Sequence, residues 1–599
     1  MPKNDDFNLL KNISGPNDLK KFSIDKLYDL SDEIRSVITK TVSKNGGHLA
    51  SNLGVVELTI ALHYMYNSPT DKLVWDVSHQ GYTHKLLTGR FCQFSTLRKR
   101  GGISGYLRID ECNHDAFGAG HAGTAVSAAL GLAEARDLNK KKHAVVAIIG
   151  DGSLTNGLTY EGINNIGNKD TDITIVLNDN KWSISKNIGG IAKYLEKLSS
   201  VYVSGESRTD FESIFHALGF TYFGTIDGQD IEKLINVFQL AEKTKGPKLI
   251  HVVTKKGNGY SFSENKPDAF HFTSPFVLES GKVSKDTKNL TYSKAFAKTL
   301  IKIAKRDSKI IAITAAMPAG TGLDKFGETY PNRFYDVGIA EEHAVTFAAG
   351  LAKGGLKPVV AIYSSFLQRS YDQILHDIAL QKLPVIFAVD RAGIVGSDGP
   401  THHGLFDLSY LRNIPGIVLM APKDENELAQ MIYTATKYKK GPIAVRYPRG
   451  TGTGVKISRK FVRIPVGKAE KLMEGDDISI ISIGSMTYPS IKACEKLKKK
   501  GISATLYNAR FVKPIDKSMI RDAAKTGRII TVEENVLEGG FGSAILEELN
   551  KLNISNIKIK RIGIDGFVEH GEAGELRQKH GLTADNIAKS AIKLMKEKL

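Results

Sequence analysis

The amino-acid sequence predicts an α/β protein of three consecutive domains, each containing a largely parallel sheet. Its 599 residues exceed what a single hydrophobic core can organise. Continuous apolar, β-branched runs recur along the chain, as expected for strands that helices cover on both faces. Two polar joints, residues 279–290 and 451–461, separate these runs into three blocks. We therefore expect domains at residues 1–288, 289–455 and 456–599.

Each block contributes strands of the same kind. The first block has candidate strands at residues 143–150 and 171–179. The second block has them at residues 309–317, 357–366, 383–393 and 416–424. The third block has them at residues 476–486, 502–512 and 527–535. Their unbroken apolar character favours doubly wound parallel sheets in series.

The basic residues are numerous but dispersed. The formal net charge is +18, and lysines gather only in short runs near residues 140, 438 and 497, beside expected helix ends or loops. No basic helix is interleaved with aromatic residues in the manner of a nucleic-acid-binding surface. We therefore expect solvated basic faces and no nucleic-acid partner.

The apolar runs and the cysteines of the sequence bear on the expected cellular compartment. No run approaches the length of a membrane span, and the first residues lack the apolar core of a secretory signal. The cysteines, Cys92, Cys112 and Cys494, are widely spaced and form no CxxC pair, which argues against a disulfide framework and against a zinc site. These features predict a cytoplasmic protein with no membrane partner.

Two adjacent glutamates stand in the apolar helical run "DVGIAEEHAVTFAAGLA", residues 336–352. Helical spacing places Glu341 on one face with Val345, Ala348 and Ala352, so we expect its side chain to be buried. A buried carboxylate must be protonated or hydrogen-bonded to a partner. The simplest alternative is a helix N-terminus, where a first-turn glutamate complements the helix dipole and needs no further role.

Polar side chains follow two of the expected strands at their carboxyl ends. "HAVVAIIGDG" ends in Asp151 and Gly152, and "TDITIVLNDN" ends in Asn180. Open α/β sheets bind ligands at this edge. Carboxylate and amide oxygens suit Mg²⁺, which takes its remaining ligands from phosphates. The pair predicts a diphosphate held through a metal, whereas GDG alone would indicate only a strand-to-helix turn.

GDG followed by NDN, each closing an apolar strand, resembles the thiamin diphosphate fingerprint of the transketolase-like enzymes. The resemblance extends from "GGHLASNLGVVELTIALHYMY" to "GLTADNI", nearly the whole chain. Its most specific pieces are "WDVSHQGYTHKLLTGR", "AEEHAVTFAAGLA", "YSSFLQRSYDQILHDIALQKLPVIFAVDRAGIVGSDGPTHHG" and "RYPRG". It implies diphosphate-binding, pyrimidine-binding and C-terminal domains in that order, thiamin diphosphate and Mg²⁺ as cofactors, and a homodimer.

Within this family the chain looks most like the transferases that join pyruvate to D-glyceraldehyde 3-phosphate with release of CO₂. That reaction is the first step of the methylerythritol phosphate route to isoprenoids and also feeds thiamin and pyridoxal synthesis. The block "DRAGIVGSDGPTHHG", residues 390–404, favours this branch over transketolase itself or a decarboxylating component with a lipoyl partner. The alternative from another class is a non-catalytic paralogue that binds the cofactor as a sensor.

The resemblance assigns catalytic and cofactor-binding roles. Glu341 would contact N1′ of the aminopyrimidine ring and promote activation of the cofactor. The histidines His48, His79 and His271 would orient pyruvate and move protons. The cofactor would be bound by His79, Gly120, His121, Asp151, Gly152, Ser153, Asn180, Lys256, Glu341 and Phe366. The magnesium ligands would be Asp151, Asn180 and the main-chain oxygen of Trp182.

A further set is implied to contact the substrates: His48, Tyr363, Arg369, Arg391, Asp398, His402 and Arg449. Arg391 and Arg449 would meet the acceptor phosphate, which suits them because a planar guanidinium binds phosphate at two points. Asp398 and His402 would meet the hydroxyl and carbonyl oxygens of the acceptor. Other histidines, His403 among them, are assigned no role, because such residues more often belong to the core or the surface.

Two features depart from the family pattern. The segment from residue 201 onward is shorter by roughly forty residues than the family's usual length, which puts lid behaviour in doubt but leaves the fold intact. In "GAGHAGTAV", Ala122 and Gly123 stand where the family usually has serines. Hydroxyl groups near the cofactor phosphates are thereby lost, although main-chain amides still bind anions there.

Overall fold

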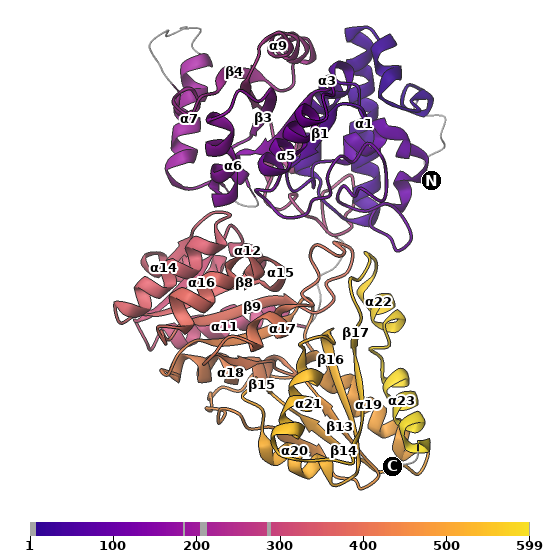
Figure 1. Cartoon of the computed structure of the whole chain (residues 1–599), viewed down its shortest axis with the longest axis vertical. Helices are drawn as coiled ribbons and strands as arrows, with labels where there is room; N and C mark the ends of the chain where they lie inside the picture. The colour runs from indigo at the N-terminus through magenta and orange to yellow at the C-terminus, as the bar shows by residue number, and fades with distance from the viewer. Residues whose placement is uncertain (1–7, 184–185, 204–212, 284–288, 598–599) are drawn as a thin grey trace. The chain divides into compact units, whose positions relative to one another are not determined.

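The computed structural model describes residues 8–183, 186–203, 213–283 and 289–597. By their contacts the residues divide into two compact units, Met1–Asp286 with Gly338–Ala340, and Thr287–Val337 with Glu341–Leu599. The first unit contains one sheet and the second unit contains two (Figure 1). The expected boundaries at residues 288 and 455 stay predictions. The shortened segment falls largely on residues 204–212, which lie outside the described residues.

The first unit holds a five-stranded sheet in which every pairing is parallel. Its order is β1-β2-β3-β5-β4, formed by β1 (Lys72–Trp75), β2 (Val145–Gly150), β3 (Ile173–Asp179), β4 (Thr221–Asp227) and β5 (Pro247–Val253). The neighbours β2 and β3 both end at the edge where the GDG and NDN motifs begin, since Gly150 pairs with Asn178.

Alternate residues of these strands face two separate hydrophobic cores. One core packs against α1 (Ile24–Asn45), α3 (Val56–Met65) and α9 (Ile231–Lys243). The other packs against α5 (Ala125–Leu138), α6 (Gly157–Gly167) and α7 (Gly189–Val203). Shorter helices are α2 (Ala50–Leu53), α4 (Tyr82–Lys85), α8 (Ile214–Ala217) and α10 (Ser261–Asn265). Helices on both faces explain why the strand sequences are apolar without alternation.

The second sheet has seven strands in the order β15-β10-β11-β9-β8-β6-β7. They are β6 (Ile310–Thr314), β7 (Phe334–Asp336), β8 (Lys357–Tyr363), β9 (Ile386–Ala392), β10 (Val418–Met420), β11 (Ile443–Pro448) and β15 (Phe511–Lys513). All pairings are parallel except that of β15 with β10. Its helices are α11 (Tyr292–Ala304), α12 (Pro318–Thr321), α13 (Asp324–Thr329), α14 (Glu341–Lys353), α15 (Ser364–Leu367), α16 (Tyr371–Gln373), α17 (Asp407–Arg412) and α18 (Glu425–Lys437).

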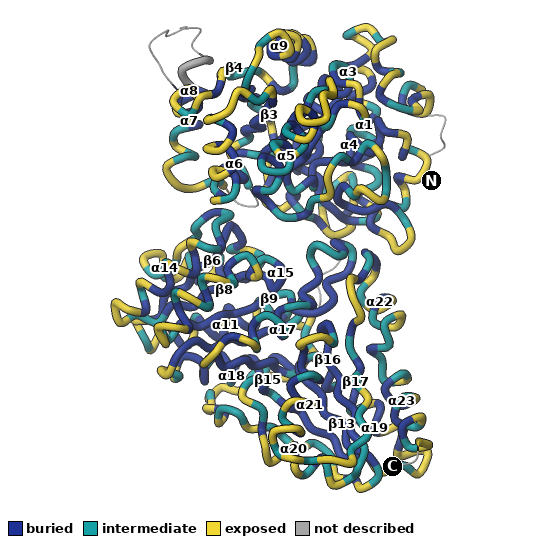
Figure 2. Tube along the Cα trace, viewed as in Figure 1, coloured by how far each residue is buried: buried dark blue, intermediate teal, exposed yellow. Residues whose placement is uncertain are grey.

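The third sheet has five strands in the order β12-β14-β13-β16-β17. They are β12 (Glu470–Met473), which is antiparallel to its neighbour, and the parallel strands β13 (Ile478–Ser482), β14 (Ala504–Asn508), β16 (Arg528–Val536) and β17 (Lys558–Ile564). Its helices are α19 (Thr487–Lys498), α20 (Lys517–Ala524), α21 (Phe541–Lys551), α22 (Ala573–Lys579) and α23 (Ala584–Lys596). The central strands of all three sheets are largely buried, whereas the edge strands β4, β7, β12 and β17 carry exposed residues, and most other exposed residues lie on helices and loops (Figure 2).

Every strand predicted from the sequence overlaps a strand of the structure, but one prediction was wrong in its connectivity. Residues 502–512 form two strands rather than one. Arg510 lies between them with a φ of 60°, a left-handed conformation that ends the first strand. The chain then enters the second sheet as β15, so a strand expected in the third sheet completes the second.

Among the helices of the described residues, none is both long enough and apolar enough to cross a bilayer.

The second unit contains a buried ion pair whose loss should be costly. The Arg446 guanidinium donates to both carboxylate oxygens of Asp407, at 2.7 and 2.9 Å, and to the carbonyl oxygens of Gly404 and Glu534. Both side chains of the pair are almost fully buried. Removing one partner of such a pair leaves an uncompensated buried charge.

We expect Asp407→Ala to lower the free energy of unfolding of the second unit by about 3–5 kcal/mol. Both tryptophans, Trp75 and Trp182, lie in the first unit, so tryptophan fluorescence would not report on the second unit. Unfolding by guanidinium chloride is therefore followed by far-UV circular dichroism. The control is Lys496→Ala, which removes an exposed pair with Asp585 and should cost about 0–1 kcal/mol. Equal losses in the free energy of unfolding for the two variants would contradict the inference that the buried Asp407–Arg446 pair is costlier to break than an exposed pair.

Candidate active site

Three predicted catalytic histidines lie together in the first unit. The ring centroids of His48 and His79 are 5.2 Å apart, those of His48 and His271 are 5.5 Å apart, and those of His79 and His271 are 5.1 Å apart. His79 follows β1, and its Nδ1 is buried with no hydrogen-bond partner among the described residues. The structure therefore brings together three residues that are widely separated in the sequence.

Burial keeps two of these imidazoles neutral. It lowers the pKa of His79 to about 3, and the nearby Lys256 ammonium acts in the same direction. The same causes hold the pKa of His271 well below its ordinary value. The Lys256 ammonium lies 3.2 Å from His271 Nδ1 and also donates to the Ser183 carbonyl oxygen. Because an ammonium can only donate, Nδ1 of His271 accepts and its proton resides on Nε2.

The three predicted magnesium ligands are adjacent at the ends of β2 and β3. The Asn180 N–H donates to Asp151 Oδ2 at 3.1 Å, and the Trp182 N–H donates to Asn180 Oδ1 at 3.1 Å. Burial and the neighbouring Asp179 carboxylate raise the pKa of Asp151 to about 8. The Asp151 carboxylate, the Asn180 amide oxygen and the Trp182 main-chain oxygen are hard donors, which fit a divalent cation that also binds phosphate.

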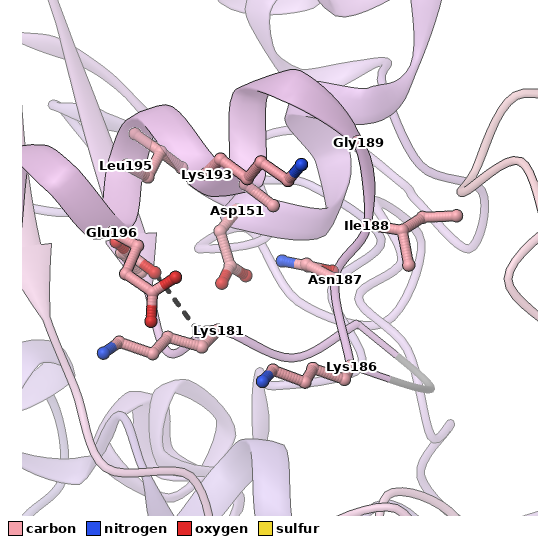
Figure 3. A pocket seen from close by; sticks show the side chains of 11 residues that line it. Asp151, Lys181, Lys186, Asn187, Ile188, Gly189, Lys193, Leu195 and Glu196 are labelled. Atoms are coloured by element: carbon pink, nitrogen blue, oxygen red, sulfur yellow. Dashed lines mark hydrogen bonds between the residues drawn. The ribbon is translucent and has the colours of Figure 1, made fainter.

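A cavity of about 390 Å³ opens beside Asp151 (Figure 3). Asp179 and Glu196 also line it, and three lysines, Lys181, Lys186 and Lys193, contribute positive charge. Figure 3 shows the Asp151 carboxylate between the first turn of α7 and the chain that carries Lys181 and Lys186. A wall with lysines close to a carboxylate suits a phosphorylated ligand that approaches together with its metal.

Asp76, which sequence reasoning did not select, ties together the loops predicted to bind the cofactor. Its carboxylate accepts the Gly123 N–H at 2.9 Å, the Ala125 N–H at 3.1 Å and the Ser153 hydroxyl. The side chain is buried, at 1% exposure. Its position directly after β1 was the signal available in the sequence, because carboxylates at parallel strand ends tend to serve the site.

The loop that follows Asp76 is strained. Val77 and Ser78 have φ values of 56° and 63°, a conformation that non-glycine residues rarely adopt. Such strain persists where the surrounding structure imposes it, commonly next to a functional side chain, which here is His79. Gly123 also has a positive φ, of 87°, and a Cβ at that position would lie 2.2 Å from Asn156 Oδ1. The absence of a serine at residue 123 is therefore a backbone requirement of this loop.

In the second unit, Glu341 is the first residue of α14 and is buried at 2% exposure. Val345, Ala348 and Ala352 are buried with it, as the helical spacing predicted, and Ala349 is buried as well. The helix does begin at Glu341, as the simpler interpretation required. That interpretation leaves unexplained the Oε2 atom, which is buried without a hydrogen-bond partner among the described residues.

The environment of Glu341 favours its protonated form. Burial raises the pKa of this carboxyl to about 7, despite the opposing effect of the Arg369 guanidinium. Arg369 lies 3.8 Å from the neighbouring Glu342, whose side chain is partly exposed. An unpaired buried carboxyl oxygen is the observation that fits a ligand nitrogen, because otherwise the cost of burial has no compensation.

Four predicted ligand-binding side chains of the second unit pack against one another. The rings of Tyr363 and Phe366 lie 5.6 Å apart, and those of Phe366 and His402 lie 5.4 Å apart. The Arg391 guanidinium lies 3.9 Å from the centroid of the Tyr363 ring. Arg391 has a φ of 57°, so the backbone holds it in a strained conformation at the end of β9.

Asp398 and Arg449 also lie together. Arg449 Nη1 donates to Asp398 Oδ2 at 3.2 Å and to the Val395 carbonyl oxygen at 3.0 Å. The Arg449 side chain is 29% exposed, whereas Asp398 is buried. The guanidinium thus contacts both Asp398 and Val395, and the Arg449 side chain remains partly exposed.

Family models place the chain among the transketolase-like enzymes. The model of the transketolase pyrimidine-binding domain matches residues 288–453, and that of the transketolase C-terminal domain matches residues 467–587. The model described as 1-deoxy-D-xylulose-5-phosphate synthase matches residues 10–213 and 205–254. The chain belongs to the 1-deoxy-D-xylulose-5-phosphate synthase family of transketolase-like transferases.

Similar proteins cover almost the entire chain. A 1-deoxy-D-xylulose-5-phosphate synthase from Halothermothrix orenii is 49% identical over 625 residues, spanning 99% of this chain and 98% of its own. One from Desulforudis audaxviator is 49% identical and spans 97% of both chains. The 1-deoxy-D-xylulose-5-phosphate synthase 1 of Geobacter sulfurreducens is 50% identical and spans 97% of this chain and 96% of its own.

The raised pKa of Glu341 predicts a pH-dependent penalty on stability. A carboxyl whose pKa rises from 4.5 to about 7 on folding loses stability as pH rises through that window, because the folded state retains the proton. At pH 8 the cofactor-free protein should gain about 3 kcal/mol from Glu341→Gln, and below about pH 4.5 the two proteins should be equally stable.

Melting temperatures of the cofactor-free proteins between pH 4 and pH 8 measure this difference. Glu342→Gln serves as the matched control, because that side chain is 36% exposed and its replacement should have a small effect at every pH. A Glu341→Gln effect that stays constant with pH would refute the assignment.

Proposed function

We propose that this chain catalyses the condensation of pyruvate with D-glyceraldehyde 3-phosphate, with release of CO₂, to form 1-deoxy-D-xylulose 5-phosphate. The single observation that carries the proposal is the buried, unpartnered Oε2 of Glu341 at the start of α14. The likeness to synthases of this name over nearly the whole chain supports the choice of substrates.

Thiamin diphosphate would be the cofactor, and Mg²⁺ would bridge it to the protein. Asp151, Asn180 and the main-chain oxygen of Trp182 would ligate the metal. When bound, thiamin diphosphate supplies the electron sink that lets pyruvate lose CO₂ and its remaining two-carbon unit attack an aldehyde. Support comes from the oxygen donors at the ends of two adjacent parallel strands and from the lysine-containing wall beside them.

Protein groups would place and move the protons. Glu341 would share a proton with the aminopyrimidine nitrogen N1′, a task that suits a carboxyl whose pKa lies near neutrality. His271 would present Nε2–H as a donor, since its Nδ1 is engaged by Lys256. His48 and His79 would orient pyruvate beside it. Burial of these side chains would exclude water from the reacting groups and so limit unwanted proton transfer.

Charged groups of the second unit would receive the acceptor. Arg391 and Arg449 would bind the phosphate of glyceraldehyde 3-phosphate, and Asp398 with His402 would contact its oxygens. Phe366 would stack on the pyrimidine ring, with Tyr363 and Arg369 beside it. The stacked and ion-paired arrangement of these side chains supports the proposal, because prepositioned groups lose little freedom when a ligand binds.

The biological setting follows the family resemblance. We propose a cytoplasmic homodimer that catalyses the first step of the methylerythritol phosphate route to isoprenoids and feeds thiamin and pyridoxal synthesis. We also propose that residues 1–288 form the diphosphate-binding domain, residues 289–455 the pyrimidine-binding domain and residues 456–599 the C-terminal domain.

The decisive experiment measures CO₂ release from pyruvate by the purified protein with thiamin diphosphate and Mg²⁺, with and without D-glyceraldehyde 3-phosphate. We expect release that rises with the aldehyde, formation of 1-deoxy-D-xylulose 5-phosphate, and loss of at least 100-fold in kcat for Glu341→Ala, because proton transfer by a positioned group contributes about 10²–10⁴-fold. Cofactor binding without CO₂ release would instead favour the non-catalytic paralogue.

Arg449→Ala should weaken the binding of glyceraldehyde 3-phosphate, the acceptor substrate, without affecting the binding of pyruvate, the donor substrate. A charge-assisted hydrogen bond is worth about 1.5–3 kcal/mol, so KM for glyceraldehyde 3-phosphate should rise about 10- to 150-fold while KM for pyruvate stays unchanged. Steady-state kinetics with each substrate varied in turn measures this. The control is Arg463→Ala, an exposed arginine outside the predicted site, and an unchanged acceptor KM in Arg449→Ala would disprove the assignment.

A further inference from the structure

The segment Gly393–Gly404, which we term the acceptor loop, is closed at its base. The Gly393 N–H donates to the Gly404 carbonyl oxygen at 2.6 Å, and the Gly404 N–H donates back to Gly393 at 2.8 Å. Between them, Gly396 and Gly399 have positive φ values that bend the chain. Asp398, predicted to contact the acceptor, lies inside this closed segment.

The acceptor loop is anchored in the core of the third sheet rather than in that of the second. Ile394 and Leu405, each 1% exposed, belong to the hydrophobic cluster formed by β13, β14, β16 and α23. The Ile394 N–H donates to Glu534 Oε1 at 3.1 Å, and Arg577 donates to the same oxygen at 2.7 Å. Residues of β16 and α22 thus hold one end of a loop that begins at the end of β9.

His403 forms a second link, between the acceptor loop and the segment that follows β17. The Val395 N–H donates to His403 Nδ1 at 3.0 Å, and His403 Nε2 lies 3.0 Å from the Glu569 carbonyl oxygen. An amide N–H can only donate and a carbonyl oxygen can only accept. The imidazole must therefore be neutral with its proton on Nε2, and at 2% exposure it has no access to water that could replace either bond.

His403 holds the N–H of the residue whose carbonyl oxygen contacts Arg449. The Val395 N–H donates to His403 Nδ1, and the Val395 carbonyl oxygen accepts Arg449 Nη1 at 3.0 Å. The same guanidinium nitrogen reaches Asp398 Oδ2 at 3.2 Å. A change in the backbone conformation of Val395 would thus move the carbonyl oxygen that contacts Arg449.

We propose that His403 is a positioning residue for the acceptor, one that joins the Val395 N–H to the Glu569 carbonyl oxygen, fixes the backbone conformation at Val395 and thereby orients Arg449. This inference rests on the proposed function, because it assumes that Arg449 binds the acceptor phosphate. The C-terminal part of the chain would then contribute to acceptor binding. Contacts of Glu534 and Glu569 would set the conformation of the acceptor loop, which carries residues predicted to bind glyceraldehyde 3-phosphate.

The test compares His403→Leu with His403→Gln. Leucine fills similar space but offers neither an acceptor nor a donor. Glutamine carries an oxygen that can accept the Val395 N–H and a nitrogen that can donate to Glu569, separated much as the two imidazole nitrogens are. We expect His403→Leu to raise KM for glyceraldehyde 3-phosphate about tenfold. Its kcat and its KM for pyruvate should stay within about twofold of the parent values. In His403→Gln, KM for glyceraldehyde 3-phosphate should return most of the way to the parent value.

One control variant and one further measurement separate positioning from a general loss of stability. Ile587→Val removes one methyl group from the same core on α23, far along the chain from the acceptor loop, and should leave both KM values unchanged. Hydrogen–deuterium exchange of peptides spanning residues 393–399 should be faster in His403→Leu than in the parent and near the parent rate in His403→Gln.

The outcomes distinguish the two proposals. An active enzyme whose acceptor KM and loop exchange are indifferent to His403→Leu overturns the positioning role alone. Equal changes in both KM values, or the same change in Ile587→Val, also overturn it, because they indicate general loosening. A parent protein that binds thiamin diphosphate and forms no product defeats the proposed function and, with it, the role of His403.

Discussion

Burying a carboxyl oxygen without a hydrogen-bond partner lowers the stability of the folded state, and the second unit contains such a group at Glu341. The surrounding face of α14 is made of small apolar residues, so no side chain of the helix relieves the charge. The result is a group whose pKa is raised to about 7, at which it can both hold and release a proton under physiological conditions. The stability of this region and its proposed chemistry therefore depend on the same desolvation.

The chemistry-bearing residues of both units cluster at one kind of location, the carboxyl ends of parallel strands. In the first unit, Asp76, Asp151 and Asn180 follow β1, β2 and β3. In the second unit, Tyr363 ends β8 and Arg391 lies at the end of β9. A parallel sheet places these ends along one edge, so within each unit short polar sequences that are distant in the chain lie side by side.

The sequence was informative where the physical cause is local. Strand positions and the fold class follow from apolar runs between polar joints, and the burial of Glu341 follows from helical periodicity. What the sequence could not reveal depends on partners distant in the chain. The position of Asp76 after β1 was visible in the sequence, but its bonds to Gly123 and Ser153 were not, and neither was the contact of His403 with Glu569. The turn at Arg510 interrupts an apolar run whose composition alone favours one uninterrupted strand.

The exchange of β15 between sheets has a consequence for how the chain can be divided. Phe511, which is 1% exposed, packs in the core of the second sheet although it follows β14 of the third. A fragment that stops at residue 455 would therefore lack both an edge strand and a core aromatic ring, leaving the β10 backbone open to pair with other molecules. The second and third sheets share one compact unit, and a division of the chain at residue 455 would separate two strands that pair with each other.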